Sequence, residues 1–187
     1  LLKGATVEYL LRRLFTLRAG HTTLFHAAAG GVGLLFGQWA AALGVELIGT
    51  VGSEAKRELA LANGYAEVLL SGRDDVVEVV RSRTAGAMLP VVYDGVGAAT
   101  FQQSLDCLAP RGLMVSFGNA SGSPPPFDLQ ELAGRGSLFI TRPSLMAYVA
   151  TTEELRACAA EVFARVQDGT LTVTIARQHR PSTRRVR

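Results

Sequence analysis

The sequence predicts an α/β fold, a doubly wound parallel sheet with helices on both faces. Three observations support this prediction. Apolar runs of strand length alternate with segments of helical period along most of the 187 residues. A glycine-rich turn separates the first strand from the next helix. Apolar residues make up 48% of the chain, as expected for strands buried on both faces. Strict alternation of strand and helix requires parallel pairing with right-handed crossovers.

The predicted strands are short apolar runs bounded by glycine or polar residues. They cover residues 22–26, 45–51, 67–70, 91–94, 113–117, 137–141 and 171–175. The run at 45–51 is continuous and apolar, which favours a strand in the interior of the sheet.

The predicted helices show apolar residues at helical spacing and recognisable ends. They cover residues 2–17, 31–43, 54–63, 74–83, 100–108 and 151–168. Ser53 is placed to cap the third of these helices, and Asp128 to cap an additional short helix. Thr151 and Glu154 have the spacing of a capping box before the last helix.

The glycine turn has the pattern A-x-G-x-x-G, running from Ala28 to Gly33. Gly30 allows the backbone to approach a pyrophosphate, and Gly33 allows the helix to pack close to the strand. The amino end of the helix then offers unpaired N–H groups and a partial positive charge to the anion. The order strand, turn and helix therefore predicts a Rossmann-type dinucleotide site.

The end of the second strand indicates which dinucleotide binds. NAD-specific sites place a carboxylate here to bind the ribose 2′-hydroxyl, but the chain has Gly52 and Ser53. Lys56 follows one helical turn later and could pair with a 2′-phosphate. A charge-assisted hydrogen bond contributes about 1.5–3 kcal/mol, which favours NADP over NAD. Glu54 opposes this interpretation if its carboxylate turns toward the phosphate.

Charge and cysteine content exclude several other classes of protein. The net charge is +3, but five arginines lie in residues 177–187, and the rest of the chain has 14 basic and 16 acidic residues. We therefore expect no nucleic-acid binding by the folded body. Cys107 and Cys158 lie in apolar patterns and are interpreted as buried free thiols, which favours a reducing, cytoplasmic location. No zinc-ligand spacing, signal peptide or membrane-spanning run occurs.

Two polar residues end strands beside the expected cleft. Asp94 ends the fourth strand and His26 ends the first. We interpret both as structural, because hydride transfer from a nicotinamide needs no protein nucleophile and the cofactor carries the chemistry. No catalytic residue is therefore assigned.

Six blocks of sequence, in order, resemble one known family. They cover residues 2–11, 25–33, 92–97, 104–108, 112–119 and 141–145. This combination resembles the zeta-crystallin-like NADPH:quinone oxidoreductases of the medium-chain dehydrogenase/reductase superfamily. The resemblance extends from residue 1 to about residue 178.

The resemblance implies where NADPH would lie. The nicotinamide would lie near Thr6, Tyr9, Ser144 and Leu145. The pyrophosphate would contact Gly30, Gly31 and Val32. The adenosine 2′-phosphate would contact Gly52, Ser53 and Lys56. The cleft at the ends of the fourth and fifth strands would be lined by Val96, Phe117, Gly118 and Asn119. Many relatives have a tyrosine at the position of Ser71, so the chain lacks that stacking partner.

The resemblance also implies the organisation of the protein. Residues 1–20 would link to a preceding GroES-like domain, residues 21–176 would form the NADP-binding domain, and residues 177–187 would be a disordered or aberrant tail. The expected protein is a zinc-free homodimer that pairs through strand 137–141 and transfers hydride from NADPH to a quinone. Two alternatives remain open. One is a zinc-free enoyl reductase acting on an enone, and the other is a non-catalytic RNA-binding or structural relative.

Overall fold

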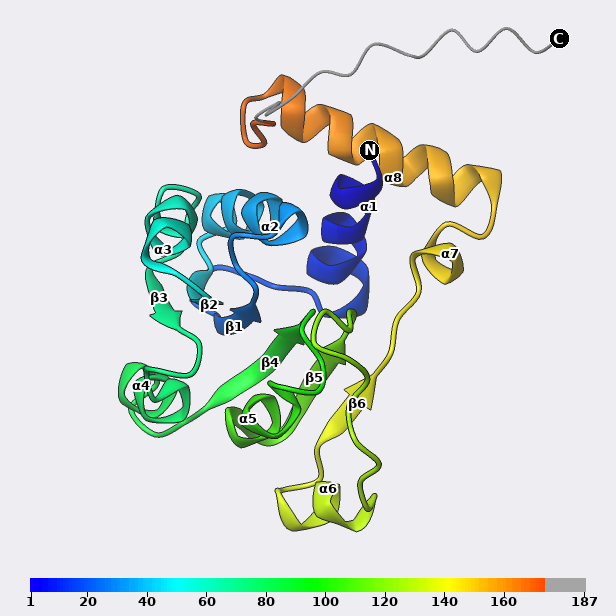
Figure 1. Cartoon of the computed structure of the whole chain (residues 1–187). Coiled ribbons are helices and arrows are strands. Elements are labelled where there is room, and N and C mark those ends of the chain that lie inside the picture. Colours follow the sequence, from blue (N-terminus) through cyan, green and yellow to red (C-terminus); the bar gives the residue numbers. More distant parts are fainter. Residues whose placement is uncertain (174–187) are drawn as a thin grey trace, which may run out of the picture.

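The six strands form one parallel sheet in a computed structural model that describes residues 1–173 (Figure 1). Their bounds are β1 (Thr22–His26), β2 (Glu46–Val51), β3 (Glu67–Leu70), β4 (Leu89–Asp94), β5 (Leu108–Ser116) and β6 (Phe139–Thr141). The order across the sheet is β3-β2-β1-β4-β5-β6, and every pairing is parallel. The order reverses between β1 and β4, so the predicted doubly wound fold is confirmed.

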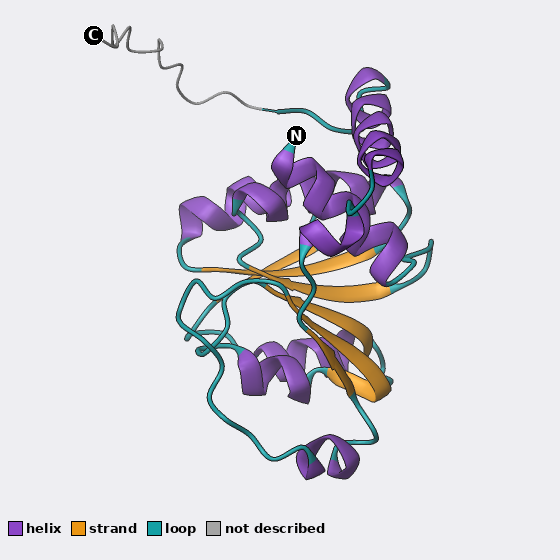
Figure 2. Ribbon diagram, turned by 90° about the vertical axis from the view of Figure 1, so that its right-hand side faces the viewer, coloured by secondary structure: helices purple, strands orange, loops and turns teal. Residues whose placement is uncertain are grey.

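Helices cover both faces of this sheet (Figure 2). Those on one side of the sheet are α1 (Leu2–Glu8), the π-helix η1 (Tyr9–Leu14), α2 (Gly31–Ala42), α3 (Glu54–Leu61) and α8 (Thr152–Gln167). Those packed on the other are α4 (Val76–Arg83), α5 (Phe101–Asp106) and α6 (Gln130–Gly134). A short helix, α7 (Leu145–Tyr148), lies between β6 and α8.

The alternation of side chains along the strands builds the two cores. Leu24 of β1 packs with the α4 and α5 side, and Phe25 packs with the α1 and α2 side. Their exposed fractions are 0% and 1%. Both faces of the strand are therefore apolar, as the composition predicted for a buried parallel sheet.

Helices α1 and η1 contribute side chains to the core that contains Phe25. Leu10 and Leu11 are fully buried, and the Tyr93 hydroxyl donates a hydrogen bond to the Leu10 carbonyl at 3.0 Å. An ideal Cβ at Gly4 would lie 2.6 Å from Val162 Cγ1, so glycine allows α1 to lie against α8. The first and last described helices are thus neighbours (Figure 1).

Several predicted bounds are wrong. The first helix ends at Leu14 because Phe15 is extended, and its second half is a π-helix. Strand β5 begins at Leu108, directly after α5, whereas β6 begins only at Phe139 because Ser137 has φ +61°. Residues 171–173 are not a strand, and the rest of the strand predicted at 171–175 lies outside the described residues.

The helix caps are partly as predicted. The capping box of Thr151 and Glu154 is confirmed, with both reciprocal hydrogen bonds present. Ser53 stands at the N-cap of α3 but its side chain makes no capping hydrogen bond, so that prediction is wrong. Asp128 accepts a hydrogen bond from the Gln130 N–H at 2.9 Å, although Leu129 is the N-cap residue.

Candidate dinucleotide site

The glycine turn joins β1 to α2 where the strand order reverses. An ideal Cβ at Gly33 would lie 2.7 Å from the Ala28 carbonyl carbon, so only glycine allows α2 to approach the strand this closely. Gly30 is the N-cap of α2, and the first turn of α2 holds no acidic residue. Gly31 and Val32 follow in that first turn, whose N–H groups have no intrahelical partner. The turn can therefore receive an anion.

The backbone conformation of Ala27 shows that this turn is strained. Ala27 has φ +60°, in the left-handed region that favours glycine, and its carbonyl accepts a hydrogen bond from the Gly30 N–H at 2.8 Å. Such strain clusters at ligand sites.

The end of β2 presents an open surface with basic character. An ideal Cβ at Gly52 would meet nothing within 4 Å, and the Ser53 hydroxyl makes no capping bond. The Glu54 carboxylate lies 3.3 Å from Arg73 and 3.7 Å from Arg57, so two guanidinium groups balance its charge. Lys56 is exposed and forms no salt bridge with any residue from 1 to 173. A phosphate can thus be bound here by an unpaired ammonium.

The loops that follow β4 and β5 pack directly on each other. The N–H groups of Phe117 and Gly118 donate to the Asp94 carbonyl at 2.8 and 3.3 Å, and the Ser121 N–H donates to the Val96 carbonyl at 2.8 Å. An ideal Cβ at Gly118 would lie 2.9 Å from Gly95 atoms. The structure therefore brings Val96, Phe117, Gly118 and Asn119 together at the carboxyl ends of β4 and β5.

Asp94 organises this pair of loops and is fully buried. Its Oδ1 accepts hydrogen bonds from the Val96 and Gly97 N–H groups at 2.8 and 2.9 Å. Its Oδ2 accepts from the hydroxyls of Thr100 and Ser104, both at 2.8 Å. With four donors satisfied, Asp94 has the structural role that the sequence predicted.

Arg142 belongs to the site but was not predicted to. From the residue after β6, its Nη1 donates to the Ser116 carbonyl at 3.1 Å, the Gly118 carbonyl at 3.0 Å and Asn119 Oδ1 at 2.9 Å. It thereby fixes the loop after β5. Only its inclusion in the block at 141–145 could have pointed to it.

The residues expected near the nicotinamide lie on α1, η1 and α7. Tyr9, at the start of η1, is buried and stacks on Tyr148 of α7. Thr6 is half-buried, with its hydroxyl bonded to the Leu2 carbonyl at 3.1 Å. Ser144 is the N-cap of α7, and the adjacent Leu145 packs against the core on the α2 face.

His26 is a buried neutral histidine beneath the glycine turn. Burial lowers its pKa to about 4, and the Asp94 carboxylate opposes this shift. Its Nδ1 lies 2.8 Å from the Thr50 hydroxyl oxygen, and its Nε2 has no hydrogen-bond partner among the described residues. The structural role predicted for His26 agrees with this burial.

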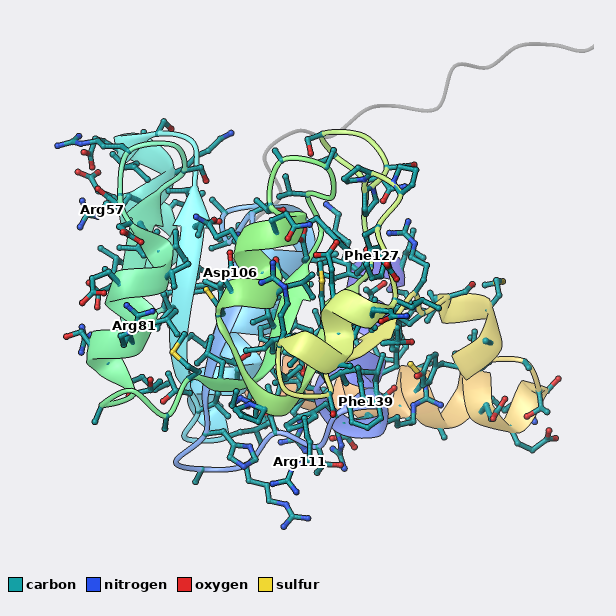
Figure 3. The ribbon with its side chains drawn as sticks, turned by 90° about the horizontal axis from the view of Figure 1, so that it is seen from below. Arg57, Arg81, Asp106, Arg111, Phe127 and Phe139 are labelled. Atoms are coloured by element: carbon teal, nitrogen blue, oxygen red, sulfur yellow. The ribbon has the colours of Figure 1, made fainter. Side chains whose placement is uncertain are left out.

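A cavity of about 550 Å³ opens beside the loop after β5. Its lining is mostly apolar and includes Asn119, Pro125, Phe127, Ile140 and Arg142. Figure 3 shows Phe127 from below the sheet. The proline-rich run at 124–126 was predicted only as a loop.

The cysteines and the other potential metal ligands of residues 1–173 form no disulfide and no metal-binding cluster. Cys107 and Cys158 are both buried and free, as predicted. In the range 1–173, no three His, Cys, Asp or Glu side chains are grouped so that they could hold a metal. Within the same range, no helix is long and apolar enough to cross a bilayer.

Comparison with solved structures supports the fold. The Escherichia coli quinone oxidoreductase, whose crystal structure is a complex with NADPH, superposes with a TM-score of 0.92 at 48% identity. The superposition covers 94% of this chain and 54% of that one.

Comparison of sequences points to the same relatives. A Pseudomonas aeruginosa quinone oxidoreductase is 51% identical over 175 residues, 94% of this chain and 54% of that protein. A 2-haloacrylate reductase from Burkholderia is 42% identical over 178 residues, 95% of this chain and 54% of that protein. The chain spans about half the length of these relatives. The family described as zinc-binding dehydrogenase matches residues 31–164. The chain therefore belongs to the zinc-binding dehydrogenase family and resembles the quinone oxidoreductases within it.

Proposed function

We propose that this chain is the cofactor-binding part of an NADPH-dependent oxidoreductase that transfers hydride to a quinone. The observation that carries the proposal is the combination of the open glycine turn with an unpaired Lys56 beyond β2. No carboxylate follows β2 at Gly52 and Ser53, and Glu54 is already paired with arginines. The NADPH complex of the Escherichia coli relative supports the choice of cofactor.

We propose that the chain binds the cofactor in the arrangement that the family resemblance implies. Gly30, Gly31 and Val32 would bind the pyrophosphate, and Gly52, Ser53 and Lys56 the 2′-phosphate. Val96 in the loop after β4, and Phe117, Gly118 and Asn119 in the loop after β5, would line the cleft. Thr6, Tyr9, Ser144 and Leu145 would lie toward the nicotinamide. When bound, NADPH supplies the hydride, and these residues orient its ring and exclude water.

Reduction of an activated alkene is the second candidate activity. It is favoured by the 42% identity to the 2-haloacrylate reductase, and it agrees with the enoyl-reductase alternative. A quinone and an enone are both small acceptors that take hydride at a carbon or oxygen conjugated with a carbonyl. Parallel assays with a benzoquinone and with 2-chloroacrylate, on a protein that also carries the GroES-like domain proposed below, would distinguish them.

We further propose a homodimer that pairs near strand 137–141. Strand β6 is at the edge of the sheet, and Phe139 on it is 61% exposed (Figure 3). An exposed apolar edge strand is a pairing surface. Sedimentation at high micromolar concentration should detect dimers, and a strictly monomeric species would contradict the proposal.

The remaining expectations rest on the resemblance. We propose a zinc-free, cytoplasmic enzyme in which residues 1–20 connect to a GroES-like domain and residues 21–176 form the cofactor domain. The tail predicted at 177–187 lies outside the described residues. Metal analysis of purified protein checks the expected absence of zinc.

The cofactor proposal is tested by titrating the chain with NADPH and NADH and following nicotinamide fluorescence. We expect tighter binding of NADPH, together with little benzoquinone reduction by the chain alone. Holding an acceptor at near-attack distance contributes about 7–11 kcal/mol, and the chain spans only about half of its relatives. Absence of NADPH binding would refute the proposal.

A further inference from the structure

Lys3 places the end of its side chain over the glycine turn. An ideal Cβ at Gly31 would overlap Lys3 Nζ and would lie 2.7 Å from Cε and 2.8 Å from Cδ. The ammonium therefore reaches the first residue of α2 because residue 31 has no side chain. Nothing in the sequence pattern singled out Lys3.

The charge of Lys3 is not balanced by a carboxylate. Within residues 1–173 it forms no salt bridge, and neither α1 nor α2 has an acidic residue in its first turn. The amino end of the 12-residue helix α2 carries a partial positive charge of its own. An ammonium beside that end is unfavourable unless an anion contacts both.

The backbone of Lys3 is held rigidly at this place. The neighbouring Gly4 lets α1 lie against Val162 of α8, and the Ala5 carbonyl lies 4.0 Å from the Cys158 thiol. Helix α1 also lies against α2 (Figure 1). Two packed neighbours thus set the direction from which the Lys3 side chain reaches the turn.

We propose that Lys3 binds the pyrophosphate of the dinucleotide. The inference rests on the proposed function and adds a residue to that site. Lys3 and Lys56 are the only two lysines in the sequence. Each lysine recognises a different part of the cofactor. Lys56 binds the 2′-phosphate that distinguishes NADPH, and Lys3 binds the pyrophosphate that NADPH and NADH share.

The test compares Lys3→Met with Lys56→Ala, using NADPH, NADH and adenosine 2′-monophosphate, which has the 2′-phosphate but no 5′-phosphate. Lys3→Met should weaken NADPH and NADH by the same factor, about tenfold, and leave the binding of the monophosphate unchanged. Lys56→Ala should weaken NADPH and the monophosphate but not NADH. Lys3→Arg should keep most of the affinity, and thermal melting should show that all variants are folded.

Gly31→Ala tests the steric part of the inference. The added methyl group would displace the Lys3 ammonium, so this variant should lose affinity for both dinucleotides. Adding Lys3→Met to it should then cost less than a further twofold. Fully additive losses would overturn the coupling between the two residues.

The outcomes separate this inference from the proposed function. If the wild-type chain binds neither dinucleotide, the proposed function fails and the role of Lys3 fails with it. If the wild type binds both but Lys3→Met changes neither affinity by more than twofold, only the inference is refuted. An equal loss of adenosine 2′-monophosphate binding in Lys3→Met would likewise refute it, because that probe has no 5′-phosphate for Lys3 to contact.

Discussion

The rings of Tyr9 and Tyr148 stack with their centroids 4.4 Å apart and their planes 14° from parallel. Arg13 reinforces the contact by donating a hydrogen bond to the Tyr148 carbonyl at 2.6 Å. Burial, with a smaller contribution from Tyr148, raises the pKa of Tyr9 to about 12. The pair therefore holds α7 against η1.

A double-mutant cycle measures this stacking. Tyr9→Leu and Tyr148→Leu should show a coupling of about 1 kcal/mol in the free energy of unfolding, obtained from urea denaturation, because stacked aromatic rings contribute beyond their buried area. Tyr148→Leu combined with Phe101→Leu is the control, since Phe101 belongs to the other core. A coupling near zero for the tyrosine pair would contradict the stacking.

Arg142→Lys should loosen the loop after β5. The lysine side chain is one bond shorter, so its ammonium falls short of the point where Nη1 of Arg142 contacts the carbonyls of Ser116 and Gly118 and the Asn119 amide oxygen. Loss of one net hydrogen bond, about 1 kcal/mol, should speed amide exchange at Phe117 and Gly118 by roughly fivefold. Hydrogen–deuterium exchange measures this. Arg111→Lys is the control, because Arg111 is exposed, and it should leave those rates unchanged.

Asp94→Asn should lower the free energy of unfolding by about 3 kcal/mol. The asparagine oxygen can replace one carboxylate oxygen, but the NH2 group cannot accept the hydrogen bonds that the other oxygen now receives, so buried donors would remain unsatisfied. Asp106→Asn is the control, because its ion pair with Arg135 is at the surface and should contribute less than about 1 kcal/mol. A stability of Asp94→Asn equal to wild type would show that Asp94 does not hold the loops together.

Acidification should destabilise the chain through His26. The folded-state pKa of about 4 is below the ordinary value of 6.5, so the folded state binds fewer protons than the unfolded state between these pH values. Stability from this group is complete above pH 6.5 and declines toward pH 4, by a total of about 3 kcal/mol.

The matched variant for this effect is His26→Gln, which should lose less stability than wild type over that pH interval. Urea denaturation at several pH values measures the difference between the two chains. His21→Gln, at a partly exposed site, should keep the wild-type slope. Identical slopes for wild type and His26→Gln would refute the assignment.

Lys56→Ala should lower the preference for NADPH. Loss of one charge-assisted contact should weaken NADPH binding roughly tenfold, while NADH binding should hardly change. Arg57→Ala is the control, since Arg57 already lies beside Glu54 on the same helix. Added salt should reproduce part of the loss in the wild type. Equal weakening of both cofactors would mean that Lys56 supports the fold and does not bind the phosphate.

The parts of the fold that could be predicted are those encoded by local pattern. Strand β3 has its predicted bounds because an apolar run there is bounded by polar turns. The glycine turn and the start of α2 could likewise be predicted, because a side chain at Gly30 or Gly33 would crowd the neighbouring backbone. The capping box before α8 needs only two residues three positions apart.

The parts that could not be predicted depend on partners distant in sequence. Helix α7 has only four residues, and its position depends on Tyr148 meeting Tyr9. The role of Arg142 depends on acceptors in another loop. The change from α-helix to π-helix at Tyr9 leaves no trace in the apolar spacing.

The contact of Gly4 with Val162 constrains the order of events during synthesis. A ribosome releases α1 first, but the partner that completes its packing emerges only after β6 and α7. Until then the surface of α1 at Gly4 and Ala5 has no α8 beside it. The nascent chain therefore carries an unfinished surface from the synthesis of α1 to the synthesis of α8, which is the period when a chaperone would bind it.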